Sequence, residues 1–336
     1  IAANPKNFGS NRTYSVTRGG KKEKIENALE EVGATLIDNK TGAIIGMMGG
    51  RDFNVEQTNH ATASRQPGSA MKPIAAYAPA LELGILQPGS PIDDSPVLLA
   101  DGSKGTHLPL NWDRKYHGMM SAREALRQSW NVPAIKTYLK VGIPTALNYV
   151  KKMGVTTLVD SDNHAATGVI GGLAYGLNSE EITNAFSTFA NDGNFVDAYM
   201  IQKIVDSRGN TIYEHNVTPV KVFSPQTAYL MTDMMRTVVN SGTGASVRRY
   251  VPKGIDMAGK TGTTNDSYDL WFVGYTPDVT LGVWTGYDVP TTIPGSAQRR
   301  PMEIWGKVMT EVFKIDSKVA DKSAKFSKPS GIVSVD

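Results

Sequence analysis

Ser69 and Lys72 form the only S-x-x-K pattern in the 336-residue chain. A serine hydroxyl is a weak nucleophile that needs a base within hydrogen-bond reach. Positions i and i+3 share one face of a helix, so Lys72 is expected to meet Ser69 Oγ. Lysine becomes a base when burial or a neighbouring cation disfavours its charged form. The pair can supply a nucleophile and its base, although a helix cap beside a solvated lysine explains an isolated S-x-x-K more simply.

A second motif, Ser129-Trp130-Asn131, lies between two predicted helices. The Ser129 hydroxyl could relay a proton between Lys72 and a leaving group, and the Asn131 amide could hold a substrate carbonyl. The alternative is a helix cap, because Asn131 stands two residues before Pro133, where a helix is expected to begin.

A third motif, Lys260-Thr261-Gly262-Thr263, closes a predicted strand. Gly262 allows a ligand to approach the backbone closely. Lys260 and the threonine hydroxyls could bind a substrate carboxylate. The alternative is a basic strand end followed by a polar turn.

The second and third motifs each have another copy in the chain. Residues 161–163 (Ser-Asp-Asn) repeat S-x-N, and residues 40–42 (Lys-Thr-Gly) repeat K-T-G. Residues 40–42 precede Ser69 and make a good hairpin loop. Residues 161–163 lie in a polar run with no helix predicted directly before it. We therefore assign the two motifs to Ser129 and Lys260.

The hydrophobic pattern predicts strands towards both ends of the chain and helices between them. The predicted strands are residues 34–37, 43–48, 200–206, 211–214, 256–263, 269–275 and 280–284. The predicted helices are residues 21–31, 69–83 with a kink at Pro79, 121–128, 133–139, 144–153, 179–191, 225–239 and 302–313. Residues 87–118 are expected to be a long surface excursion. This order favours one sheet assembled from both ends, a helical lobe and a site in the cleft between them.

The composition is that of a globular protein, with 40% apolar and 20% charged residues. A balance of 35 basic against 32 acidic residues, a net charge of +3, gives no argument for nucleic-acid binding. The absence of cysteine excludes disulfides, thiol nucleophiles and cysteine-bound metal. No apolar run approaches the about 18 residues of a membrane helix. Five scattered histidines make a metal site unexpected. We interpret a sequence that starts at Ile1 as a piece of a longer protein.

The three motifs in this order are far more specific than any one of them. With them, the chain resembles the transpeptidase domain of class A (bifunctional) penicillin-binding proteins over roughly residues 30–315. The resemblance is also carried by residues 49–53, 65–69, 125–129, 171–172, 189–193, 242–244, 271–277 and 282–286.

The resemblance implies an α/β fold of the serine penicillin-binding/β-lactamase-like type. This is a mainly antiparallel sheet flanked by helices, with a helical lobe at roughly residues 74–250 and the active site in the cleft between them. We expect the domain to occupy residues 21–316, between a tail or linker at 1–20 and a C-terminal linker at 317–336.

The implied activity is that of a D,D-transpeptidase, which cross-links peptidoglycan stem peptides through a serine acyl-enzyme and is inhibited by β-lactam antibiotics. Carried over residue by residue, the roles are nucleophile for Ser69, base for Lys72, relay for Ser129, donor-amide contact for Asn131, electrostatic partner for Lys260, carboxylate contacts for Thr261 and Thr263, and further substrate contacts for Trp130 and Gly262. The N–H groups of Ser69 and Thr263 would form the oxyanion hole. No cofactor, metal or nucleic acid is implied. We expect the full-length chain to carry a glycosyltransferase domain and a membrane anchor, and to work at the outer face of the bacterial cytoplasmic membrane.

Two alternatives stay open: a serine β-lactamase or β-lactam sensor on the same fold, and a non-catalytic cell-wall-binding module. A class A β-lactamase needs a glutamate-activated water. Glu181 is the first candidate, but Asn178 and Glu181 have the spacing of a capping box, so we interpret Glu181 as structural. The intact pair of Ser69 and Lys72 argues against the binding module.

Overall fold

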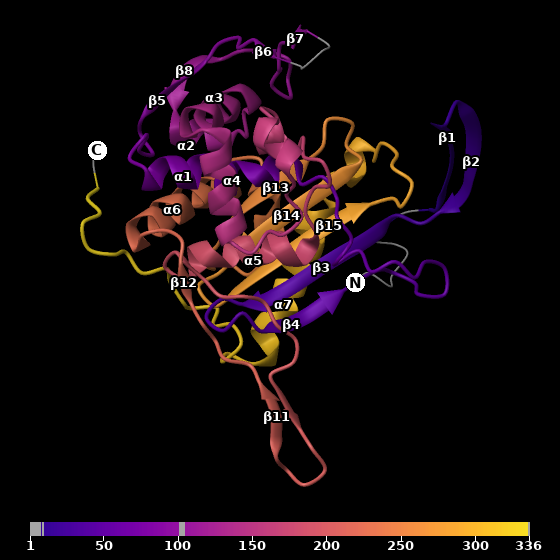
Figure 1. Cartoon of the computed structure of the whole chain (residues 1–336), viewed down its shortest axis with the longest axis vertical. Coiled ribbons are helices and arrows are strands. Elements are labelled where there is room, and N and C mark those ends of the chain that lie inside the picture. The colour runs from indigo at the N-terminus through magenta and orange to yellow at the C-terminus, as the bar shows by residue number, and fades with distance from the viewer. Residues whose placement is uncertain (1–7, 9, 101–104, 335–336) are drawn as a thin grey trace.

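The computed structural model describes residues 8, 10–100 and 105–334, and its centre is a five-stranded antiparallel sheet (Figure 1). The strand order is β13 (Ala258–Thr263), β14 (Asp269–Tyr275), β15 (Val279–Gly286), β3 (Glu31–Asp38) and β4 (Ile44–Met48). β15 pairs with β3 from Val279 opposite Asp38 to Gly286 opposite Glu31. The prediction of one sheet assembled from both ends of the chain is therefore confirmed.

The remaining elements lie between β4 and β13 in the chain, apart from an N-terminal hairpin and a C-terminal helix. The helices are α1 (Ala78–Glu82), α2 (Ala122–Arg127), α3 (Asn131–Val141), α4 (Ile143–Lys152), α5 (Ser179–Ala190), α6 (Pro225–Ser241) and α7 (Arg300–Ile315). The short strands are β1 (Arg12–Arg18), β2 (Lys21–Ala28), β5 (Pro91–Asp94), β6 (Leu99–Ala100), β7 (Thr106–His107), β8 (Gly118–Ser121), β9 (Asn194–Phe195), β10 (Lys203–Val205), β11 (Thr211–Glu214) and β12 (Val220–Lys221). The predictions for α2 to α7 and for β13 to β15 are confirmed to within a few residues at each end.

Helices cover both faces of the sheet, with α5 on one face and α7 on the other. Side chains of β14 alternate between these layers, as a two-residue strand period requires. Trp271 and Val273 pack into the core shared with the helical lobe, whereas Phe272 packs with Trp305 of α7. Because both faces are covered, β14 is buried from its second residue onwards and β15 along its whole length.

Glycines set the spacing between the sheet and its two helical layers. A Cβ atom on Gly282 of β15 would lie 2.1 Å from Thr183 Oγ1 of α5. One on Gly274 of β14 would lie 2.9 Å from the indole of Trp305 in α7. Both helices therefore sit closer to the sheet than any larger residue would permit.

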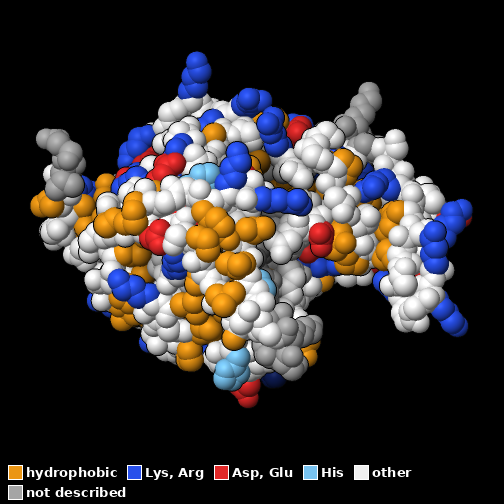
Figure 2. All heavy atoms as spheres, turned by 90° about the horizontal axis from the view of Figure 1, so that it is seen from above, with side chains coloured by type: hydrophobic (Ala, Val, Ile, Leu, Met, Phe, Trp, Pro, Cys, Tyr) orange, Lys and Arg blue, Asp and Glu red, His pale blue; other side chains and the backbone are white. Residues whose placement is uncertain are grey.

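The predicted helix at 21–31 is wrong. The tail or linker expected at residues 1–20 includes a strand from residue 12, and residues 1–7 and 9 lie outside the described residues. Residues 12–18 and 21–28 form the antiparallel hairpin β1–β2. Gly19 and Gly20 both have positive φ, 54° and 77°, as a two-residue hairpin turn requires. Ile25 and Leu29 have the spacing of one helical face, but the two glycines fix a turn directly before Lys21. Seen from above in Figure 2, the hairpin projects from the body at the right and carries Lys and Arg side chains.

The predicted helix at 69–83 is divided into three pieces. Gly68–Ala70 is a 3-10 turn, Lys72–Tyr77 is a π-helical turn, and α1 follows. The kink expected at Pro79 stays a prediction: Pro79 lies in the first turn of α1, directly after the π-helical turn, where a proline is tolerated. Lys72 therefore lies in the π-helical segment.

The excursion predicted at 87–118 is confirmed as a surface segment over residues 87–100 and 105–118, while 101–104 lie outside the described residues. It contains β5, which pairs with β8. In Figure 2, hydrophobic side chains gather on the face that carries it. The exposed apolar residues of this segment and of β8 are Leu98, Leu108, Leu110, Trp112 and Met119. In the described part of the chain, none of the helices is both long and apolar enough to span a membrane.

Residues 317–334, which belong to the C-terminal linker expected at 317–336, contact the domain, while 335–336 lie outside the described residues. Ala320 is buried. Phe326 packs edge-on against Tyr275, with the ring centroids 5.6 Å apart, and its N–H donates to Asp256. This segment is packed against the domain by apolar residues that its Lys- and Ser-rich composition concealed.

We predict that Gly282→Ala lowers the free energy of unfolding by about 1–3 kcal/mol, because the added methyl group must displace the buried Thr183. Gly46→Ala on β4 is the control, since its Cβ would meet Leu36 at an ordinary 3.7 Å. Urea unfolding of both variants measures the difference. Equal stabilities would contradict the close approach of α5.

Candidate active site

Lys72 is completely buried and turned towards the Ser129 motif. Its Nζ donates to Ser129 O at 2.6 Å, to Asn131 Oδ1 at 2.8 Å and to Ser129 Oγ at 3.2 Å. These partners are neutral, and the described residues give Lys72 no carboxylate partner. The first two predicted motifs therefore lie in direct contact.

Lys260 of β13 is also completely buried and reaches the same hydroxyl. Its Nζ donates to Ser129 Oγ at 2.8 Å and to Thr261 O at 2.9 Å. Ser129 Oγ thus lies between the amines of Lys72 and Lys260, which are 188 residues apart in the sequence. All three motifs meet at one atom.

Burial shifts the proton affinity of both amines. Burial, and then the nearby charge of Lys260, lowers the pKa of Lys72 well below its usual range. Burial lowers the pKa of Lys260 to about 7. A buried lysine with neutral partners loses its proton readily. At least one amine can therefore be neutral near neutral pH and accept a proton from a hydroxyl.

Ser129 occupies a backbone conformation that few non-glycine residues adopt, with φ = 58°. It is held there between α2 and α3, where its N–H donates to Leu126 O and the N–H of Trp130 donates to Ala125 O. The strained turn directs the hydroxyl towards both lysines. Such strain is typical of functional positions.

The segment that carries Ser69 is wedged between β13 and residues 168–176. A Cβ on Gly68 would lie 2.5 Å from Thr263 O, and one on Gly171 would lie 2.4 Å from Gly68 N. Gly68 also has φ = 54°, so glycine is required there on two grounds. Ser69 itself is half-buried beside this contact.

The expected hydrogen bond between Lys72 and Ser69 is absent from the described residues, and Ser69 Oγ makes no hydrogen bond there. Lys72 Nζ is occupied by Ser129 and Asn131 instead. Catalytic hydrogen bonds are often long in proteins without substrate and tighten when it binds. The hydroxyl of Ser69 is therefore left available for a ligand.

The third motif also faces the Ser69 segment. A Cβ on Gly262 would lie 2.4 Å from Pro67 O, which explains the glycine. The N–H of Thr264 donates to Asp269 O across the β13–β14 ladder. Because paired and unpaired residues alternate along such a ladder, the N–H of Thr263 points away from β14, towards the Ser69 segment. The Thr263 side chain is exposed, and Thr261 Oγ1 contacts Thr243 Oγ1 at 2.8 Å.

Asn131 is held in place by Asn111 and Leu110, two residues that the sequence motifs do not indicate. The side-chain oxygen of the buried Asn111 accepts from the N–H of Asn131 at 2.8 Å and of Val132 at 3.2 Å. Its amide group donates to both oxygens of Asp94. Asn131 Nδ2 donates to Leu110 O. Asn111 and Asp94 lie in the loop-like excursion, and no spacing rule links them to the S-x-N motif.

Trp130 is largely covered by other aromatic rings. It stacks on Trp112 with centroids 5.2 Å apart and on His117 at 4.0 Å, and only 7% of it is exposed. Little of its surface is left for a substrate. Its role as a substrate contact stays a prediction.

The repeated motifs lie elsewhere. Residues 161–163 belong to the 3-10 turn Asp160–His164, where the Asp162 carboxylate accepts from the N–H groups of Val159 and Ala174. Residues 40–42 form the turn between β3 and β4, where Asp38 Oδ1 accepts from both Lys40 N and Thr41 N. The choice of Ser129 and Lys260 is supported by the hydrogen bonds that Lys72 and Lys260 both donate to Ser129 Oγ.

Glu181 is engaged in structural hydrogen bonds. Its N–H donates to Asn178 Oδ1 at 2.8 Å, which confirms Asn178 as the N-cap of α5. Its carboxylate accepts from Thr156 N and Thr156 Oγ1, rather than from Asn178 as a full capping box would require. The carboxylate is held by these groups.

Comparison with known proteins agrees with this geometry. A family model described as the penicillin binding protein transpeptidase domain matches residues 32–300. The chain belongs to this family. It is 33% identical over 326 residues to penicillin-binding protein 1F of Bacillus subtilis, covering 95% of the chain and 43% of that relative. It is 35% identical over 288 residues to penicillin-binding protein 1A of Clostridium acetobutylicum, covering 83% of the chain and 35% of that relative. The chain thus spans less than half the length of these penicillin-binding proteins.

Solved structures of the family share the fold. Penicillin-binding protein 1A from Haemophilus influenzae has a TM-score of 0.76 at 23% identity, covering 90% of the chain and 51% of that protein. PonA1 from Mycobacterium tuberculosis has a TM-score of 0.74 at 25% identity, covering 90% and 81%. PonA1 has also been solved in complex with penicillin V. The α/β penicillin-binding fold expected from the sequence is confirmed.

The depressed pKa of Lys260 predicts a pH-dependent contribution to stability. The unfolded lysine keeps its proton up to its usual pKa, whereas the folded one loses it near pH 7. The unfolded state therefore binds more protons above pH 7, and the free energy of unfolding should rise from about pH 7 to 9.5. The difference in unfolding free energy between wild type and Lys260→Met, measured by urea unfolding, should grow over this range. A constant difference would contradict the shift.

Proposed function

We propose that the chain is a D,D-transpeptidase domain that cross-links peptidoglycan stem peptides through an acyl-enzyme on Ser69 and is acylated by β-lactams there. The observation that carries the proposal is the single hydroxyl of Ser129 between two buried lysines, next to the Ser69 segment. A buried amine that can be neutral, a relay hydroxyl and a free nucleophile are the groups that serine acyl transfer needs.

In acylation, Lys72 takes the Ser69 proton as the Oγ–C bond forms at the carbonyl of the penultimate D-Ala. The oxyanion accepts hydrogen bonds from the N–H groups of Ser69 and Thr263. When the C–N bond breaks, the leaving amine of the last D-Ala receives a proton through the Ser129 hydroxyl. Lys260, when charged, stabilises the oxygen of Ser129 as its proton moves.

In the second half-reaction, an amine from a neighbouring stem peptide attacks the ester. Its proton passes back through the same groups, the new C–N bond forms, and Ser69 is released with its proton restored. Before acylation, Thr261 and Thr263 at the end of β13 hold the terminal carboxylate of the donor, which leaves with the last D-Ala. The Asn131 amide contacts the donor backbone. Gly262 lets the donor approach the strand.

The wider setting is inferred from the relatives. We place this activity at the outer face of the bacterial cytoplasmic membrane, as part of a longer chain with a glycosyltransferase domain and an anchor. A β-lactamase would need a carboxylate that activates water at the ester. The bonding of Glu181 to Thr156 favours a transpeptidase over that alternative.

We predict that benzylpenicillin adds once to the protein, on Ser69, and that the adduct lasts for minutes or longer because no positioned base hydrolyses it. Losing a general base slows a step by about 10²–10⁴-fold, which is plain in a time course. Intact-mass analysis after removal of excess drug measures the adduct. Ser69→Ala should show none. Loss of the adduct within seconds would indicate a β-lactamase, and no adduct at all would indicate a binding module.

We predict that Asn131→Ala slows acylation at least about tenfold, because it removes a hydrogen bond that holds the amine of Lys72 in place. Asn163→Ala is the matched control from the repeated S-x-N motif and should leave the rate unchanged. Rate constants with a fluorescent penicillin measure both. The reverse pattern would show that residues 161–163 are the functional motif.

A further inference from the structure

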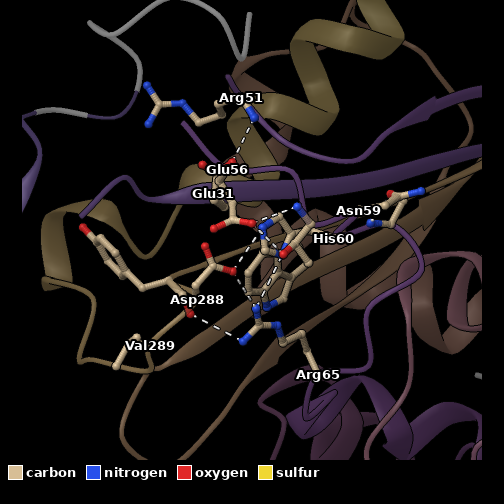
Figure 3. A network of polar contacts seen from close by, with 12 residues as sticks. Glu31, Arg51, Glu56, Asn59, His60, Arg65, Asp288 and Val289 are labelled. Atoms are coloured by element: carbon tan, nitrogen blue, oxygen red, sulfur yellow. Dashed lines mark hydrogen bonds and ion pairs between the residues drawn. The ribbon is translucent and has the colours of Figure 1, made fainter. Parts of the chain in front are cut away.

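A polar cluster that is buried at His60 and reaches the surface at Asp288 lies at the end of β15, beside the segment that leads to Ser69. In Figure 3, the side chains of His60, Arg65 and Asp288 converge, with Glu31 and Glu56 close by. His60 is completely buried and stacks on Trp284, with ring centroids 5.1 Å apart. None of these groups takes part in the chemistry proposed above.

Arg65 connects this cluster to the nucleophile. Its Nη2 lies 3.3 Å from Asp288 Oδ1, its Nη1 donates to Tyr287 O at 3.4 Å, and its guanidinium sits 4.7 Å from the ring centre of Trp284. Its backbone exchanges two hydrogen bonds of 2.9 Å with Leu177. Arg65 stands four residues before Ser69.

The residues between Arg65 and Ser69 are held firmly by hydrogen bonds and close backbone contacts. The carbonyl of Gln66 accepts from Trp271 Nε1 at 2.9 Å, and its side chain donates to Leu173 O at 2.7 Å. A Cβ on Gly176 would lie 2.2 Å from Arg65 O, so the backbones are in close contact. A shift at Arg65 would therefore carry through to Gly68 and Ser69.

Resting on the proposed function, we propose that Arg65 and Asp288 are positioning residues, whose ion pair fixes the Ser69 segment against the end of β15 in the geometry that acylation needs. Only ionised Asp288 attracts the guanidinium. The charge of Asp288 then sets how firmly the nucleophile is held.

The ring of His60 packs against both Arg65 and Asp288 and is uncharged. Burial, followed by the nearby charge of Arg65, lowers the pKa of His60 to about 4, so its ring is neutral above that pH. Its Nε2 lies 3.3 Å from Asp288 Oδ1 without hydrogen-bond geometry, and its Nδ1 lies 3.4 Å from Arg65 Nη2. The neutral ring fills the space between the two charged groups.

The pKa of Asp288 is raised towards neutral pH. Burial, followed by the negative charge of Glu56, raises its pKa to about 6, and Arg65 opposes the shift. Above that pH the carboxylate is charged and pairs with Arg65, and below it the pair loses its attraction. The titratable and charged groups that face Asp288 are Tyr14, Glu31, Glu56, His60 and Arg65.

The test compares acylation by a fluorescent penicillin in wild type and Asp288→Asn across pH. The ratio of wild-type to variant rate should be about three- to tenfold at about pH 7.5 and should fall towards one near pH 5, as expected for loss of a partly buried ion pair. Titration of Lys72 and Lys260 cancels in the ratio. Asp278→Asn, the same change at the other end of β15, should give a ratio of one throughout. A ratio of one for Asp288→Asn at every pH, or one that does not vary with pH, overturns the proposal.

Arg65→Gln and the double variant show whether the two residues act together. Each single change should slow acylation, and the double variant should be no slower than the slower single one, whereas additive effects would contradict the ion pair.

Hydrogen exchange of the peptide covering residues 65–69 gives a readout without a β-lactam. At about pH 7.5 it should be faster in Asp288→Asn than in wild type, after intrinsic rates are accounted for. Unchanged exchange in Asp288→Asn overturns the positioning role. If exchange is faster in Asp288→Asn as expected but wild type is not acylated, only the transpeptidase function is rejected.

Discussion

Two buried amines that share one hydroxyl are the constraint around which the molecule is organised. Lys72 and Lys260 both donate to Ser129 Oγ, and their other partners are neutral oxygens. Two ammonium groups in this position, without a carboxylate among the described residues, repel one another and are poorly solvated. The arrangement is therefore most stable when at least one of the two amines is neutral, and a neutral amine can act as a base.

Three unusual pieces of backbone keep this arrangement in place. The π-helical turn at Lys72–Tyr77 orients Lys72, and the positive φ of Ser129 presents its hydroxyl. The glycines at 68 and 262 let the nucleophile segment lie against β13. Each piece is locally unfavourable, and the surrounding packing compensates for it, as is typical of active sites. The excursion adds Asn111, which fixes the start of α3 and with it Asn131.

The sequence predicted most of the sheet, most of the helices and the three motifs, because their signals are local. A short apolar run marks β14, and a serine followed by proline marks the start of α6. The helix predicted directly before Ser129, and not before its repeat at 161–163, selected Ser129. What it missed depends on tertiary contacts. The N-terminal hairpin is too exposed to show a strand pattern, and only its paired glycines betray the turn. Asn111, Asp94 and the cluster at His60 are polar residues whose partners are distant in sequence, so no spacing rule could connect them. The expected contact of Lys72 with Ser69 failed because a wide helical turn and stronger acceptors on Ser129 redirect the amine.

The pairing of β3 with β15 also decides the order in which the protein can be completed as it is made. β3 is synthesised more than two hundred residues before the strand that covers its open edge. Until Val279–Gly286 has emerged, the β3–β4 hairpin exposes unpaired backbone and apolar side chains, a state prone to aggregation. Long-range antiparallel closure of this kind is slow. The newly made chain therefore depends on whatever shields β3 in the interval. Lys72 and Lys260 cannot come together before nearly the whole domain has been synthesised.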